Sequence, residues 1–113
     1  MEISRETVKG VDVIKLSGRL NTTSAPDAEK EITTIIEENP EALLINLAKV
    51  DYISSAGLRV LLLGAKMMRK DKGILGLCCL QNAVKEVFDI SGFTAIFRIF
   101  DAEEDAIKKM APA

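Results

Sequence analysis

The chain has 113 residues, a length typical of one domain, and we expect a single domain over residues 1–113. Hydrophobic residues make up 48% of the chain, which is enough apolar surface to exclude a disordered protein. The net charge of −2, with acids and bases mixed along the sequence, argues against non-specific nucleic-acid binding and against direct membrane binding by a basic helix. No apolar run approaches the roughly 18 residues of a membrane span, and residues 1–6 lack a signal core, so we expect a cytoplasmic protein.

The sequence predicts no metal site and no cofactor. It contains no histidine, and its two cysteines, Cys78 and Cys79, are adjacent within an apolar run. Neighbouring side chains of a strand point to opposite faces, so the two thiols cannot easily form a disulfide. We interpret them as buried structural thiols, because no CxxC spacing is present.

Periodicity and turn residues predict nine elements. In chain order they are strand 3–8, strand 11–16, helix 26–39, strand 42–47, helix 58–69, strand 74–80, helix 82–90, strand 95–100 and helix 101–110. Lys9-Gly10 between the first two strands is typical of an antiparallel hairpin. The later strand-helix-strand units predict parallel pairing with right-handed crossovers. The expected fold class is therefore α/β, with a mixed sheet of about five strands and about four helices packed on it.

The segment that carries functional information is the predicted polar break at residues 51–57, which contains Ser54 and Ser55. Backbone N–H groups at a helix start are free to bind an anion, and a serine there either caps the helix or presents its hydroxyl outward. Taken from the residues alone, the cap is the favoured interpretation. A nucleophilic serine would need a base, but there is no histidine, and no lysine lies at the site by spacing. The Gly-x-x-x-x-Gly-Lys spacing of a phosphate-binding loop is also missing, so we do not expect an enzyme.

Four stretches of the sequence together resemble a known family. Residues 50–58 read Val-Asp-Tyr-Ile-Ser-Ser-Ala-Gly-Leu, and this segment is similar to the signature of the STAS domain of bacterial anti-sigma factor antagonists. Residues 18–26, 44–47 and 87–93 resemble other segments of the family, in the same order along the chain. The resemblance implies a protein-interaction module that binds an anti-sigma factor with Ser/Thr kinase activity and thereby frees a sigma factor. It also implies a Ser/Thr phosphatase as a further partner.

The resemblance assigns the phosphorylated residue to Ser55. Position by position, Ser54 stands where the family has Asp, Ala56 stands at the place of a second hydroxyl residue, and Gly57 matches. The sequence departs from the family at two more places, since Arg19 replaces a frequent Glu and Asn21 replaces the usual Asp. The predicted surroundings of the phosphorylation site are Asn21, Thr22, Ser54, Ala56 and Gly57.

The predicted helix 58–69 carries two apolar stripes, of which one must pack on the sheet and the other could face a neighbouring helix or a partner. The predicted partner-binding residues are Leu58, Val60, Leu63 and Met67. Two alternatives stay open beside the phosphorylation-controlled antagonist. One is a STAS subunit of another regulatory or transporter-linked assembly that is not phosphorylated. The other is an enzyme or nucleotide-binding domain that uses the serine-rich loop as an anion site.

Overall fold

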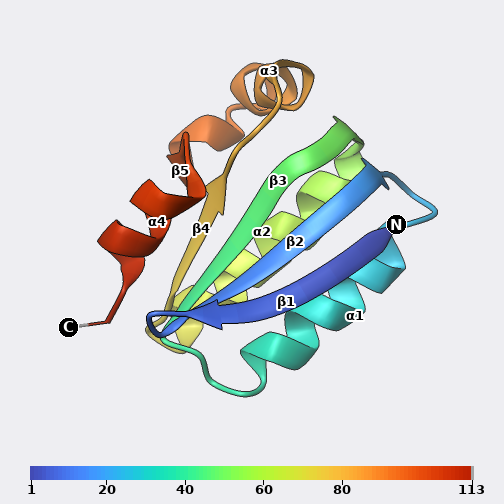
Figure 1. Cartoon of the computed structure of the whole chain (residues 1–113). Helices are drawn as coiled ribbons and strands as arrows, with labels where there is room; N and C mark the ends of the chain where they lie inside the picture. The colour runs from blue at the N-terminus through green and yellow to red at the C-terminus, as the bar shows by residue number, and fades with distance from the viewer. Residues whose placement is uncertain (113) are drawn as a thin grey trace.

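A computed structural model describes residues 1–112 as a five-stranded mixed sheet with four α-helices (Figure 1). The strands are β1 (Glu2–Val8), β2 (Val11–Leu20), β3 (Ala42–Ile53), β4 (Ile74–Cys78) and β5 (Arg98–Phe100). Their order across the sheet is β1-β2-β3-β4-β5, with β1 antiparallel to β2 and all other neighbours parallel. The predicted fold class and the predicted hairpin are thereby confirmed.

The helices cover the two faces of the sheet unequally. They are α1 (Ala25–Ile36), α2 (Ser55–Lys70), α3 (Asn82–Ser91) and α4 (Glu103–Met110), and a 3₁₀ turn spans Phe93–Ala95. One face packs against α1, α2 and α3, of which the first two lie behind the sheet in Figure 1. The other face packs against α4 alone. Among residues 1–112, every helix is too short or too polar to cross a membrane.

Alternating side chains of β2 and β3 divide the core between the two faces. Ile14 and Leu43 belong to the larger cluster under α1, α2 and α3, whereas Val13 and Leu44 belong to the smaller cluster under α4. Each of these four side chains is fully buried. A strand covered on both faces is apolar at every position, which is the pattern that residues 42–47 show.

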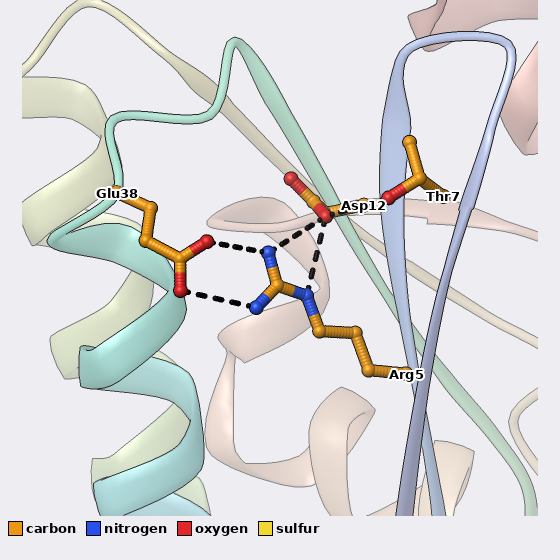
Figure 2. Close-up of polar contacts among 4 residues, drawn as sticks. All are labelled: Arg5, Thr7, Asp12 and Glu38. Atoms are coloured by element: carbon orange, nitrogen blue, oxygen red, sulfur yellow. Dashed lines mark hydrogen bonds and ion pairs between the residues drawn. The ribbon is translucent and has the colours of Figure 1, made fainter.

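An ion-pair cluster joins the edge strand β1 to the end of α1 (Figure 2). One guanidinium nitrogen of Arg5, Nη2, lies 3.1 Å from Oδ1 of Asp12 on β2 and 2.9 Å from Oε1 of Glu38. Thr7 donates a further hydrogen bond to the same Asp12 oxygen. The hydrogen bond from Arg5 holds the pKa of the Glu38 carboxyl below its ordinary value. The cluster therefore ties β1, which has only one neighbouring strand, to two other elements.

The predicted strands differ in their limits from the observed ones: β1 begins one residue earlier, β2 continues four residues further to Leu20, and β4 ends two residues earlier at Cys78. The limits of β3 and β5 also differ. β3 continues to Ile53 and α2 begins at Ser55 instead of Leu58, so of the predicted polar break at residues 51–57 only Ser54 lies outside both elements. Beyond Leu47 the strand is exposed on one side, with Val50 and Ile53 buried and the residues between them solvated, and it reads as polar for that reason. The predicted strand 95–100 is confirmed only over β5. Ala95 belongs to the 3₁₀ turn Phe93–Ala95 instead of a strand, and Phe97 packs against Phe88 of α3, with ring centroids 5.7 Å apart.

Candidate functional site at the start of α2

Ser54 is the residue that caps α2. It adopts an extended backbone, with φ −98° and ψ 173°, and its Oγ accepts a hydrogen bond of 3.3 Å from the Gly57 N–H. Its own N–H donates to the carbonyl oxygen of Leu20 at 2.9 Å, which fixes the loop to the end of β2. Since one serine fills the capping role, the neighbouring serine is released from it.

Ser55 is the first residue of α2, and it is exposed to solvent. Within residues 1–112, its hydroxyl takes part in no hydrogen bond, in contrast to the hydroxyl of Ser54. This oxygen can therefore be reached from solvent in the folded chain. A phosphate would also sit beside the free N–H groups of the helix start, where negative charge is favoured.

Gly57 lets the helix start approach β2 closely. A Cβ atom at this position would lie 2.8 Å from the Leu20 carbonyl oxygen, 2.8 Å from Leu20 Cγ and 2.9 Å from Ile53 Cγ1. Carbon atoms in contact are ordinarily about 3.5–4.0 Å apart, so a larger residue would push α2 away from the strands. The glycine therefore allows the start of α2, with Ser55, to pack closely against the ends of β2 and β3.

The loop between β2 and α1 forms the other side of the site. The Asn21 side chain accepts hydrogen bonds from the N–H groups of Thr23 (3.0 Å) and Ser24 (3.1 Å), so it shapes its own turn. Thr22 is exposed, and it lies with Ala56 on the wall of a groove of about 290 Å³ between α1 and α2. The groove is lined by Thr22, Ala25, Pro26, Glu29, Ala56, Arg59 and Val60. The structure thus places two of the predicted surrounding residues, Thr22 and Ala56, on one groove.

The four residues predicted to bind a partner do not share one environment. Leu58 and Val60 are only 6% and 5% exposed and belong to the core that α2 forms with the sheet and α1. These two residues are therefore withdrawn from the predicted contact surface, because they are already covered by the domain itself. Leu63 is 38% exposed, and Met67 is half-buried at the side of α2. Residues of both predicted stripes are buried in the domain's own core, among them Leu58, Leu61 and Val60, and Val60 also lines the groove between α1 and α2.

Sequence reasoning missed two residues beside the site. Arg59 lines the groove and lies four residues after Ser55, a spacing that places both on one side of a helix. Tyr52 is 41% exposed, and the guanidinium carbon of Arg19 lies 4.3 Å from its ring centroid, within the range of a cation–π contact. The departure at Arg19 thus has a local partner. Arg19 and Tyr52 are opposite each other on β2 and β3, but both lie beyond the predicted ends of these strands, so the sequence did not predict that they pair.

The cysteines lie away from this site. Cys78, on β4, is buried in the cluster under α4, and burial raises the pKa of its thiol. Cys79 is half-buried. Both are free thiols, and the interpretation of buried thiols is confirmed for Cys78 but only in part for Cys79. Residues 1–112 contain no group of three or more Cys, Asp or Glu side chains placed to hold a metal ion.

Comparison with known proteins identifies the family. The sequence model of the STAS domain matches residues 2–106, nearly the whole chain, and this chain belongs to the STAS domain family. It is similar to a Bordetella bronchiseptica protein named "Putative anti-sigma factor antagonist BtrV", with 39% identity over 106 residues that cover 94% of this chain and 91% of that protein. It is also 25% identical to the anti-sigma F factor antagonist of Paenibacillus polymyxa, over 97% of this chain and 95% of that one.

Solved structures show the same fold. A crystal structure of an anti-sigma factor antagonist from Mycobacterium paratuberculosis superposes with a TM-score of 0.90 and 25% identity, covering 98% of this chain and 94% of that one. The phosphorylated form of the Bacillus cell fate determinant SpoIIAA superposes with a TM-score of 0.75 and 22% identity, over 96% of this chain and 98% of that one. The resemblance drawn from the sequence motifs is therefore confirmed at the level of family and fold.

Proposed function

We propose that this chain is an anti-sigma factor antagonist that is switched by phosphorylation of Ser55. The observation that carries the proposal is the division of labour between two adjacent serines. Ser54 caps α2, while Ser55 presents a free, exposed hydroxyl at the helix start. The similarity to named antagonists over nearly the whole chain supports the partner class, which is an anti-sigma factor. The proposal places the protein in the cytoplasm, where a sigma factor acts.

The switch needs only local electrostatics. Phosphorylation adds about −1.5 to −2 charges and three acceptor oxygens to Ser55. The helix start tolerates this charge in the free domain, but a closely packed partner would have to bury it without a counter-charge. Moving an equilibrium from almost fully bound to almost fully free takes roughly 5 kcal/mol of differential affinity. The free-energy cost of burying an unpaired dianion in a desolvated contact is large enough to supply this difference. The partner would be the kinase as well, and a phosphatase would restore the binding form.

The proposed contact surface surrounds Ser55 and extends along α2. It includes the groove between α1 and α2 and, further along α2, the exposed Leu63 and the half-buried Met67. Leu63→Glu should leave the domain folded, because the side chain is 38% exposed, but should weaken partner binding by at least tenfold. Ile90→Glu on α3 is the matched control, since Ile90 is 82% exposed. Equal binding by both variants would remove α2 from the contact.

The deciding experiment is an affinity pull-down from the source bacterium with wild-type, Ser55→Ala and Ser55→Asp chains as parallel baits. The first two should capture the same anti-sigma factor, and the third should lose it. Intact-mass measurement of the protein purified from its own cells should show one added phosphate that is absent from Ser55→Ala. If Ser55→Asp binds as well as the wild type, the phosphorylation switch is refuted.

A second candidate is a STAS subunit of another assembly that is not phosphorylated. It is favoured by the site itself, where the family's acidic residue is replaced by Asn21 and the Asn21 side chain is occupied by its own turn. Under this alternative, the three baits would capture the same partner equally, and no phosphate would be found on Ser55.

A further inference from the structure

Charge is distributed unevenly between α2 and the rest of the chain. The helix holds four of the chain's 15 basic residues, and none of its 17 acidic residues lies in it. The remainder has eleven basic and 17 acidic residues, which gives it a net charge of −6. The overall value of −2 thus conceals a cationic helix on an anionic domain.

Five of the six exposed residues of α2 form one continuous row, and the sixth, Arg69, lies beside its far end. At about 100° per residue, Ser55, Arg59, Leu63, Lys66 and Lys70 fall within an arc of roughly 80°. All five are exposed, whereas Leu58, Leu61 and Met68 on the inner side are buried. We call these five residues the basic row. At about 1.5 Å per residue, it is roughly 22 Å long and begins at the candidate phosphorylation site.

The cations of the basic row are not paired within the domain. The ion pairs formed within residues 1–112 lie on β1, β2, α4 and the end of α1, and none includes a residue of α2. Glu29 of α1 lines the same groove as Arg59 without forming an ion pair with it. The guanidinium and ammonium groups of the row are therefore available to an outside partner at no cost in internal contacts.

We infer that the basic row docks an acidic protein surface whose carboxylates flank an apolar side chain, which meets Leu63. The inference rests on the proposed function and names the chemistry of its partner. A protein suits the row better than a nucleic acid for two reasons. Leu63 lies 38% exposed at the middle of the row and can be covered by an apolar group, and the rest of the domain, at −6, repels a long polyanion.

The position of Ser55 explains how one phosphate acts on this surface. Ser55 and Arg59 are four residues apart, so a phosphate on the serine lies one helical turn from the guanidinium. Its charge of about −1.5 to −2 offsets up to two of the row's three cations. Phosphorylation would therefore occupy Arg59 from within the domain and repel the carboxylates of the partner at the same end of the row.

A peptide titration tests the inference without a partner protein. The probe is a 12-residue peptide with a leucine flanked by glutamates, added to the ¹⁵N-labelled full chain at low salt. Amide shifts should centre on Arg59, Leu63 and Lys66. The double variant Arg59→Glu/Lys66→Glu should weaken binding by at least tenfold. The matched variant Lys30→Glu/Lys85→Glu reverses two exposed lysines of α1 and α3 and should change it less than about twofold. A peptide with glutamine in place of glutamate should not bind.

Three results would overturn the inference. The two double variants could lose binding equally, which would indicate a general effect of net charge. The shifts could centre away from α2. A 12-base-pair DNA duplex or vesicles of anionic lipid could bind the row more tightly than the peptide at the same salt, which would assign it to a polyanion. Failure here leaves the Ser55 pull-down result unaffected, and an unphosphorylated Ser55 in cells leaves the peptide result unaffected, so the two proposals can fail separately.

Discussion

Substituting Gly57 by alanine places a methyl group where three atoms already stand within 2.9 Å. One of them is the Leu20 carbonyl oxygen, which accepts the Ser54 N–H at 2.9 Å, so relief by backbone movement also strains that hydrogen bond. Overpacking of this kind costs about 1–3 kcal/mol. Weakening the hydrogen bonds at the cap adds about 1 kcal/mol, and the better helix propensity of alanine returns about the same amount. The net expectation is a loss of about 2 kcal/mol, or roughly 8–10 °C in Tm.

Chemical denaturation followed by far-ultraviolet circular dichroism measures this loss, and Gly64→Ala is the matched control in the same helix. A Cβ at Gly64 would meet side-chain methyl groups and no backbone atom, at 3.1 Å from Ile32 Cγ2, 3.2 Å from Leu75 Cδ1 and 3.8 Å from Ile36 Cδ1, so shifts of a few tenths of an ångström would relieve the contact. We expect this variant to stay within about 1 kcal/mol of the wild type. If Gly57→Ala were as stable as the wild type, the close approach of α2 to the strands would not be what holds Ser55 in place.

Two further predictions concern the cap and the ion-pair cluster. Ser54→Ala should cost about 1 kcal/mol in the free energy of unfolding, because the cap is lost, and Ser55→Ala less than about 0.5 kcal/mol; the opposite order would make Ser55 the cap. Arg5 lowers the pKa of Glu38 from its ordinary value of 4.5, so the stabilisation is present above that pH and is lost as the pH falls through the lowered value. Glu38→Gln should therefore be less stable than the wild type at neutral pH, with a difference that shrinks in acid, and Glu37→Gln should show no such trend; parallel profiles for wild type and Glu38→Gln would contradict this.

Most of the helices and strands could be predicted from local sequence patterns. The hairpin turn was readable because Lys9 and Gly10 both adopt positive φ values, of 52° and 81°, which such a tight turn requires. The far end of β3 was not readable, because Lys49 and Tyr52 face solvent and lower the local apolarity of a strand that the register with β2 nonetheless extends. Strand length depends on pairing with a neighbour, and periodicity within one segment contains no information about that neighbour.

Some residues of the candidate site could likewise be predicted from the sequence, whereas others required the structure. Ser55 could be chosen from the order of residues in the motif, but which of two serines caps the helix depends on where the strand ends and the helix begins. Leu58 and Val60 were assigned to a partner because a helical stripe does not reveal which side the domain itself covers. Arg59 was overlooked because its significance comes from exposure and from the lack of an acidic neighbour on α2, and both require the packed structure.

Each strand of this sheet from β2 onward lies beside the strand that precedes it in the chain. During synthesis each new strand can therefore pair with the strand made just before it, and no early strand stays unpaired until a much later one is made. By the time Lys70 has left the ribosome, β1, β2 and β3 are present together with α1 and α2, two of the three helices that cover their larger apolar face. The side chains beneath α4, such as Val13 and Leu44, stay uncovered longest, until translation reaches the last helix.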